Sequence, residues 1–551
     1  MMRTVVATVL AGVLGATSAA ARPGGVVGFG NDPVAGRPAG QNGAGLKQSG
    51  AGAGPATAAP SLLIAGHFLR RLGFGPTPEE LTVLQQQGPG PWLAQQFDPG
   101  RLQQCIAQPD PRYAPGPSPQ SVGYEYAYRW LTRMVYSPCQ LQEKMALFWH
   151  EHFASSVNKT FVFIHFRDQE SFFRAHALSP LRELLVGITK DNAMLGWLDN
   201  DGNNGNAETP PNENYARELM QLFALGPYEL TEEGDIVFIT DPAGTQVPKP
   251  TYGEEEVKAL ARQLTGWSAT YPTRYDPNTG LYDPTEEVGP ATFDLSAWDC
   301  RAKTLFGTTI AENCGAGADP TGETQVQQAI DLLLTHHNAA PFFVTEVLKK
   351  FYKENLSSPE EKQFVYDLVQ VFRNSGGNVA AVLWAAFTDP RFVSPSAVRT
   401  MYKTPIEQLT NMIRGLSGST QGVDVHDIWG YETAYRIYEP PSVFSFYRPG
   451  RKSALVNTAL VVGRDSAAAD VASNPPGNAV SSFDAAGLLE RNHIQTADQA
   501  LDFLSQNLLA APLTPAVRQL IKNYLGDGQV TAEQFRGAAF LIMASPDFQV
   551  N

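Results

Sequence analysis

The sequence predicts a mainly α-helical protein: a large multi-helix globular domain with long irregular loops and at most a small β-hairpin. Apolar residues recur at helical spacing through many segments. Alternating strand patterns are few, and no β-α-β rhythm of a doubly wound sheet is present. Hydrophobic residues make up 43% of the 551 positions, which is enough for a large packed core.

The N-terminus has the pattern of a secretory signal peptide covering residues 1–21. Arg3 precedes an apolar run from Thr4 to Ala16, and Ser18-Ala19-Ala20-Ala21 offers small residues for cleavage. The apolar run is too short to span a membrane, although an uncleaved anchor is the alternative. We therefore expect a protein secreted to the periplasm or the exterior, with no transmembrane span.

Residues 22–60 are rich in Gly, Ala and Pro and contain few large apolar side chains. Such a segment cannot bury enough surface to offset its ordering entropy, so we expect a flexible tether. The helical domain then covers residues 61–551. It could form two lobes, at about 61–267 and 323–551, joined by an irregular segment.

Helices are expected wherever the apolar period is near 3.6 residues. The clearest start is Thr77-Pro78-Glu79-Glu80, which has the pattern of a capping box with proline in the first turn. The best strand is Ile236 to Thr240, as one arm of a hairpin. The stretches Ser268 to about Gly322 and about Glu439 to Phe483 are expected to be irregular. The remaining helical patterns cover Leu62–Leu72, Gln140–Ser155, Gln169–Ala177, Pro180–Thr189, Asn212–Ala224, Glu254–Thr265, Val326–Leu334, Pro341–Tyr352, Pro359–Arg373, Val379–Thr388, Thr404–Leu416, Ala497–Leu508, Pro515–Tyr524 and Thr531–Met543.

The chain has four cysteines and no CxxC pair, so a zinc or thioredoxin-type site is not indicated. In an oxidising compartment disulfides are expected. A bond between Cys300 and Cys314 would close a short Gly-, Pro- and Asp-rich loop, and Cys105 with Cys139 follows by elimination. Four free thiols are the alternative.

The formal net charge is −14 at pH 7, and no basic cluster is present. An acidic chain repels phosphate backbones, so nucleic acid is not expected as a partner. An extracellular polymer or an envelope protein is the expected kind of partner.

A loop rich in Asp, Asn and Gly follows Trp197. Asp199, Asp201 and Asn203 alternate as at the start of an EF-hand, but Pro210 occupies the twelfth position in place of glutamate. A true EF-hand is therefore excluded. An irregular oxygen site for a divalent cation such as calcium remains a hypothesis for these three residues.

The helix that follows this loop carries Glu213, Arg217 and Glu218. Glu213 and Arg217 are four residues apart and can pair, and the helical period places Glu213 on or beside the buried face. A buried carboxylate needs a partner, and Arg217 is the nearest candidate. Two interpretations stay open: an ion-pair network that locks helix to loop, and a site for a metal or polar ligand.

His150-Glu151-His152 does not match the HExxH zinc pattern, because its histidines are two residues apart and point in different directions. We expect His152 to be a core histidine. His150 could be either a core residue or part of a functional site.

Several of these blocks resemble the bacterial domain-of-unknown-function family number 1800. The resemblance covers about residues 61–550 and is most specific in Asn212–Leu219. Its members are uncharacterised exported, mostly helical proteins, and they usually carry a His-Asp pair before a lysine where this chain has Trp298-Asp299 before Lys303. The resemblance rests on Phe68–Pro78, Phe148–Phe153, Trp197–Asn200, Pro211–Leu219, Leu264–Trp267, Lys403–Glu407 and Pro440–Phe444.

Two functions are consistent with the sequence. The one we favour is a non-catalytic binding protein of the cell envelope or matrix, because no complete catalytic set is visible. The alternative is a metal-assisted hydrolase of an extracellular substrate, in which Asp199, Glu213 and Glu218 hold the cation or act as acid and base. His150 would assist, and Arg217 would orient a carboxylate.

Overall fold

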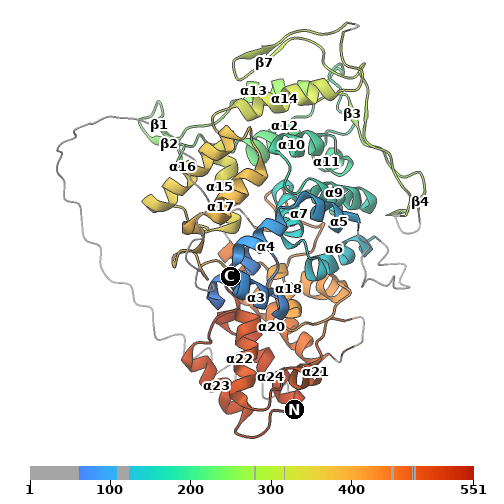
Figure 1. The fold of residues 1–551 in the computed structure, drawn as a ribbon. Helices are drawn as coiled ribbons and strands as arrows, with labels where there is room; N and C mark the ends of the chain where they lie inside the picture. Colours follow the sequence, from blue (N-terminus) through green and yellow to red (C-terminus); the bar gives the residue numbers. More distant parts are fainter. Residues whose placement is uncertain are drawn as a thin grey trace, which may run out of the picture. The chain divides into compact units, whose positions relative to one another are not determined.

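The computed structural model describes residues 61–107, 123–277, 281–283, 285–315, 317–447, 452–474, 476 and 480–551. Residues Ala58–Asn551 form one compact unit, and its described part is mainly α-helical, as the sequence predicts (Figure 1). The expected signal peptide (1–21) and tether (22–60) lie outside the described residues. The division into two lobes stays a prediction.

The first half of the described chain is a series of short and medium helices. The predicted capping box at Thr77 is confirmed: its hydroxyl accepts from the backbone N–H of Glu80, and the Glu80 carboxylate accepts from the N–H of Thr77. A π-helical turn, Leu219–Ala224, continues α12. The helices are α2 (Leu62–Arg71), α3 (Pro78–Gln87), α4 (Pro89–Gln96), α5 (Pro99–Ala107), α6 (Glu125–Tyr136), α7 (Gln140–Phe153), α8 (Val157–Thr160), α9 (Phe163–Ala175), α10 (Leu181–Thr189), α11 (Asn192–Trp197), α12 (Asn214–Glu218) and α13 (Glu254–Gln263).

The second half continues in the same way. Its short turns are Pro390–Val393, Val425–Trp429, Lys452–Leu455, Ser505–Leu509 and Pro546–Phe548. Its helices are α14 (Glu323–Thr335), α15 (Ala339–Phe351), α16 (Pro359–Asn374), α17 (Val379–Thr388), α18 (Pro405–Gly415), α19 (Gly430–Glu432), α20 (Thr458–Ser473), α21 (Ala485–Arg491), α22 (Ala497–Leu504), α23 (Pro515–Leu525) and α24 (Ala532–Met543).

The strands are short and form four antiparallel pairs within the described residues, where the sequence indicated one hairpin. That hairpin is present, because Ile239 lies opposite Val247. The other three pairs lie in the Pro- and Asp-rich stretch between α13 and α14. The pairs are β1 (Phe238–Thr240) with β2 (Gln246–Pro248), β3 (Trp267–Ser268) with β6 (Thr292–Phe293), β4 (Tyr275–Asp276) with β5 (Leu281–Tyr282), and β7 (Lys303–Leu305) with β8 (Thr308–Ile310).

Two helices are buried on almost every side and form the centre of the core. Every residue of α18 is buried, and so is every residue of α7 except His152. The helix α7 packs against α4, α6 and α9, and α18 packs against α6 and α20. A helix buried all round is normally apolar throughout, yet these two carry Lys144, Glu151 and Glu407. These charges must therefore find partners inside the protein.

The helix α20 corrects the expectation that about Glu439 to Phe483 is irregular. It has no clear polar–apolar period for a sequence pattern to detect, because its buried face combines small residues with a buried arginine, Arg464. Gly463, Ala467 and Ala468 are buried there, and the helix packs against α18 and α24. Close packing of small side chains and the hydrogen bonds that Arg464 donates to Gln408 and Gln549, rather than amphipathicity, stabilise this helix.

Both expected disulfides are present, Cys105–Cys139 and Cys300–Cys314. The second closes the loop that contains β7 and β8, as expected from its short spacing. Throughout the described ranges, no helix is both long and apolar enough to cross a bilayer.

We expect the double variant Cys300→Ser/Cys314→Ser to lower the free energy of unfolding by about 3 kcal/mol, because the bond restricts the unfolded chain over 14 residues. The bond between Cys105 and Cys139 closes a longer loop of 34 residues, so Cys105→Ser/Cys139→Ser should lower the free energy of unfolding by about 4 kcal/mol. Urea denaturation of the two variants measures both values. Equal stability of the wild type and both variants would contradict the stabilising role.

Candidate functional site

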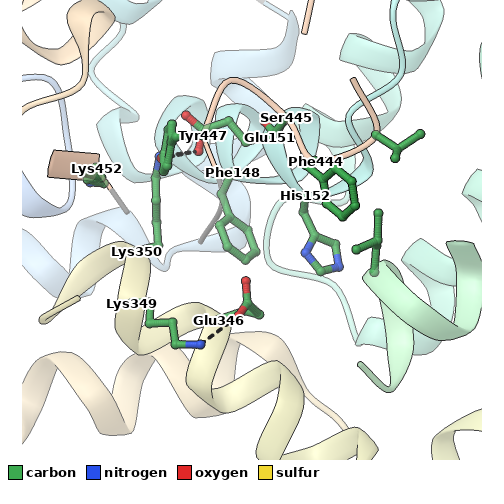
Figure 2. Close-up of a pocket in the computed structure, with 12 residues that line it drawn as sticks. Phe148, Glu151, His152, Glu346, Lys349, Lys350, Phe444, Ser445, Tyr447 and Lys452 are labelled. Carbon is green, nitrogen blue, oxygen red and sulfur yellow. Dashed lines mark hydrogen bonds and ion pairs between the residues drawn. The ribbon is translucent and has the colours of Figure 1, made fainter. Parts of the chain in front are cut away.

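A small cavity lies where α7, α15, residues 443–447 and Lys452 meet (Figure 2). Its volume is about 80 Å³. One part of its wall is apolar and the other carries charged and hydroxyl groups. The lining residues are Phe148, Glu151, His152, Leu222, Glu346, Lys349, Lys350, Val443, Phe444, Ser445, Tyr447 and Lys452.

Glu151 is the central acceptor on the polar side of this cavity. The ammonium of Lys350 and the hydroxyl of Tyr447 donate to its Oε2, the latter at 3.1 Å, and the hydroxyl of Tyr435 donates to its Oε1. Lys350 also donates to the Tyr447 hydroxyl at 3.3 Å, and Figure 2 shows it reaching from α15 toward Glu151 and Tyr447. Burial and the nearby Glu151 carboxylate hold the pKa values of both tyrosines well above the usual range, so both remain neutral donors.

His152 lies on the other side of Phe148 in this view (Figure 2). Its Nε2 lies 3.0 Å from the carbonyl oxygen of Phe223, and burial lowers its pKa to about 4. The ring is therefore neutral at pH 7, with Nε2 as the donor and Nδ1 as an acceptor. Close by on α15, Lys349 donates to Glu346 at 3.3 Å, and burial raises the pKa of Glu346. His152 thus borders a cavity in addition to packing in the core.

A second buried carboxylate, Glu407 at the start of α18, lies near Lys452 of the cavity wall. Its Oε1 accepts from Lys144 at 2.6 Å and lies 3.7 Å from the ammonium of Lys452. Its Oε2 accepts from the N–H of Thr404 and from the amide of Asn551. Burial alone would raise the pKa of Glu407, but the surrounding ammonium groups hold it well below the usual range, so it remains a carboxylate.

The three residues considered for calcium already have protein partners. Asp199 accepts from Lys159 at 2.5 Å and from Asn214, and Asp201 accepts from the N–H of Ala269 and from a tyrosine hydroxyl. Asn203 is buried and uses its amide within the loop and toward Asn212. In the part of the chain that the structure describes, no group of three or more His, Cys, Asp or Glu side chains could hold a metal ion. Cation binding by this loop stays a prediction.

Asp199 and Asp201 do share a surface hollow of about 490 Å³. The hydroxyl of Tyr271 donates to Asp201 at 2.7 Å. Tyr282 also lines the hollow, and its ring centre lies 6.1 Å from that of Tyr271 and 5.1 Å from that of Tyr275. The hollow is completed by Lys159, Thr160 and Gly196.

The burial expected for Glu213 is wrong. Its side chain is 30% exposed, and Arg217 donates to it at 3.0 Å while also forming a bidentate pair with Glu254. The reason is that α12 spans only Asn214–Glu218, so Glu213 lies just before the helix and outside its buried face. Glu218 is half-buried, and burial raises its pKa.

His150 is placed in the core. Its Nε2 accepts from the N–H of Tyr438 at 3.2 Å, its ring packs on Trp130, and burial lowers its pKa to about 3. It is therefore a neutral acceptor in the core, whereas the side chains of Arg217 and Glu213 are 35% and 30% exposed and Glu218 is half-buried. Asp299, at the position where relatives are expected to carry His-Asp, is buried and paired with arginines.

Sequence reasoning singled out Asp199 and Asp201 of the hollow and His152 of the cavity but missed the other residues that line the two sites. Glu151 lies between His150 and His152, and only these two histidines were considered as site residues. Its partners Lys350 and Tyr447 are 199 and 296 residues away in the chain. The only local signal was a glutamate that closely follows the apolar run Met145–Trp149 of α7. Lys452 and Tyr282 lay in stretches expected to be irregular.

A family model described as "Protein of unknown function (DUF1800)" matches residues 67–550, nearly the whole chain. No curated protein and no solved structure matches the chain.

We expect Glu213→Gln to lower stability by less than about 1 kcal/mol, because Arg217 keeps its pair with Glu254 and the lost ion pair is partly exposed. Thermal unfolding and elemental analysis of the purified variant check this. Glu208→Gln, in the same loop and exposed, is the matched control. A bound metal in the wild type and in Glu208→Gln that Glu213→Gln loses would instead support the cation site.

Glu407→Gln should cost about 3–5 kcal/mol at neutral pH, because it leaves Lys144 buried without its carboxylate. The folded-state pKa of Glu407 is depressed, so its contribution is fully present above about pH 4.5 and is lost as the pH falls through the folded-state value. The stability difference between wild type and variant should therefore shrink in acid. Glu255→Gln, which breaks an exposed pair with Lys258, is the control and should change stability by less than about 1 kcal/mol.

Proposed function

We propose that this chain, which belongs to the DUF1800 family of proteins of unknown function, is an exported, non-catalytic binding protein of the cell envelope or matrix. Its ligand is a neutral polysaccharide, bound at the hollow beside Asp199 and Asp201. The observation that supports this most is the row of tyrosines that leads into that hollow.

The tyrosine row consists of Tyr275, Tyr282 and Tyr271, in spatial order. Tyr275 is 53% exposed and Tyr271 is also exposed, so large apolar ring faces are open to solvent. Tyrosine combines such a face with a hydroxyl, and this combination is enriched at binding surfaces. The apolar faces of sugar rings can pack on these side chains, and successive rings suit a chain of linked sugars better than a single one.

The polar groups of the hollow suit sugar hydroxyls. Asp199 and Asp201 each retain further acceptor capacity, since a carboxylate has about four lone-pair sites. Lys159 supplies donors at the same edge. Two carboxylates against one ammonium leave the hollow negative, and the whole chain carries a formal charge of −14. An anionic polymer would be repelled, which favours a neutral one.

The arrangement of the carboxylates favours binding over catalysis. Asp199 is held by Lys159 and Asn214, and Asp201 by Tyr271 and a backbone N–H. Groups fixed in this way orient a ligand but are poorly placed to exchange protons with it. Export is supported by the signal-peptide pattern of residues 1–21 and is consistent with the two disulfides.

One observation favours the alternative, a metal-assisted hydrolase that acts through Asp199, Glu213 and Glu218. Glu218 has a raised pKa, and its Oε2 is buried with no hydrogen-bond partner among the described residues. Such a carboxyl can serve as a general acid. Glu213, however, is paired with Arg217, and His150 is in the core. Glu218 would therefore have to act without Glu213 and His150, the residues expected to take part in the reaction with it.

The test is titration of the purified mature protein with soluble neutral polysaccharides (dextran, a mixed-linkage β-glucan and chitin oligosaccharides) by calorimetry. Tyr275→Ala and Tyr282→Ala should each weaken binding about tenfold, as expected for one lost aromatic contact. Tyr431→Ala, at a tyrosine that is 76% exposed elsewhere, should leave the affinity unchanged.

Unchanged affinity in the Tyr275→Ala/Tyr282→Ala double variant would contradict the assignment of this surface. Tighter binding of alginate, an anionic polymer, would contradict the neutral ligand. Release of new reducing ends from a bound polysaccharide, lost in Glu218→Gln, would replace the binding protein with the hydrolase.

A further inference from the structure

Tyr271, at one end of the tyrosine row, depends on side chains for its position. It follows the short strand β3, where the backbone leaves the strand pair. One carboxylate oxygen of Asp201 accepts from the N–H of Ala269 at 2.8 Å, and the other accepts from the Tyr271 hydroxyl at 2.7 Å. The amide oxygen of Asn192 accepts from the N–H of Thr270 at 3.1 Å. Groups from α11 and the loop after it therefore hold the segment that carries this tyrosine.

His165 of α9 supports the same segment from the interior. The residue is 1% exposed, and its Nε2 lies 2.8 Å from the carbonyl oxygen of Thr270. A carbonyl oxygen only accepts, so Nε2 is the donor and carries the proton of the neutral ring. The centre of the ring lies 5.4 Å from that of Tyr271. His165 thus packs against the ring of Tyr271 and is hydrogen-bonded to the backbone just before it.

The other ring nitrogen of His165 has no partner. Nδ1 is buried and makes no hydrogen bond among the described residues. Burial lowers the pKa of His165, and the Thr270 carbonyl and the Asp201 carboxylate oppose this effect without reversing it. The ring is therefore mainly neutral at pH 7. A second proton would place a charge and an unpartnered N–H in the interior, which is costly.

A proton on Nδ1 would compete for the carboxylate of Asp201. This is the charged group that acts on the His165 ring, and both of its oxygens already accept, one from a backbone N–H and the other from Tyr271. Tyr271 is neutral, because burial and Asp201 raise its pKa. The neighbouring Asp199 is paired with Lys159, and the helix α11 carries no charged side chain. The ion pairs of α9 itself are Arg133–Glu170, Arg167–Asp168, Arg167–Glu287, Arg174–Glu143 and Arg174–Glu170.

We propose that His165 is a positioning residue of the saccharide site and that its protonation weakens binding there. The neutral ring holds Thr270 and packs against Tyr271, whose hydroxyl stays on Asp201. In acid the imidazolium attracts the carboxylate of Asp201, and Tyr271 loses the contact that keeps its ring at the edge of the hollow. This inference rests on the proposed function, because it concerns the regulation of the same site.

Binding should be strongest above pH 6.5 and should weaken as the pH falls through the folded-state pKa of His165, which lies below that value. Because one proton is taken up, the affinity can fall by at most about tenfold per pH unit. By linkage, a bound saccharide must lower the pKa of His165 by the matching amount. The unfolded chain binds this proton more readily than the folded one, so the free energy of unfolding also decreases below pH 6.5.

The test is calorimetric titration with dextran, the mixed-linkage β-glucan and chitin oligosaccharides at pH 7.5 and pH 5. We expect wild type to bind several-fold more weakly at pH 5. His165→Leu cannot donate to Thr270, so it should bind several-fold more weakly than wild type at pH 7.5. His165→Gln can donate from its amide but does not titrate, so it should restore most of the affinity at pH 7.5 and keep it at pH 5. His176→Gln, at the other end of α9, is the matched control and should keep the pH dependence of wild type.

Amide hydrogen exchange of the segment Ala269–Tyr271 measures the positioning without a ligand. At pH 5 this segment should exchange faster in wild type than in His165→Gln, and at pH 7.5 at the same rate. Equal exchange at pH 5 would overturn the role of His165. So would wild-type and His165→Gln proteins, both folded by thermal unfolding, whose affinities change alike between the two pH values. Absence of binding to all three saccharides at both pH values would instead overturn the proposed function, and this inference with it.

Discussion

The carboxylate of Glu407 is the interaction on which the interior of this protein depends. It closes the capping box of α18 through the N–H of Thr404, and it accepts from Lys144 of α7. The two most deeply buried helices are thus joined by an ion pair with almost no exposure to water. An apolar pair could supply similar stability. The ion pair, however, also specifies the register between α7 and α18, because only one alignment brings the two charges together.

The same carboxylate connects this scaffold to the cavity beside α7. Because Lys144 takes its Oε1 at hydrogen-bond distance, Lys452 is left at 3.7 Å. The cavity wall carries the ammonium groups of Lys349, Lys350 and Lys452 and the carboxylates of Glu151 and Glu346. A change in Glu407 would therefore alter the electrostatics of the cavity as well as the contact between the two helices.

The hollow beside Asp199 is organised by a different principle. Its charged groups are close to solvent, where ion pairs contribute little to stability, and its ordered loops depend on local hydrogen bonds of Asp and Asn side chains. Short strand pairs bring Tyr275 next to Tyr282. Exposed rings supported by such loops suit recognition of an extended ligand.

The sequence by itself determined the helical class, the hairpin at Ile239, the capping box at Thr77 and the pairing of Cys300 with Cys314, because each depends on neighbours within a few turns or on a short loop. The pairing of Cys105 with Cys139, which spans 34 residues, followed only by elimination. It did not reveal α20, whose buried face combines small residues with the buried Arg464 and has no clear helical period of polarity. It also overestimated the burial of Glu213, since the first residue of α12 could not be read from the pattern. Only the tertiary structure decided the sites: Glu151 meets Lys350 and Tyr447 across 199 and 296 residues. No local spacing encodes which buried charges share a partner, because that is set by how distant helices pack.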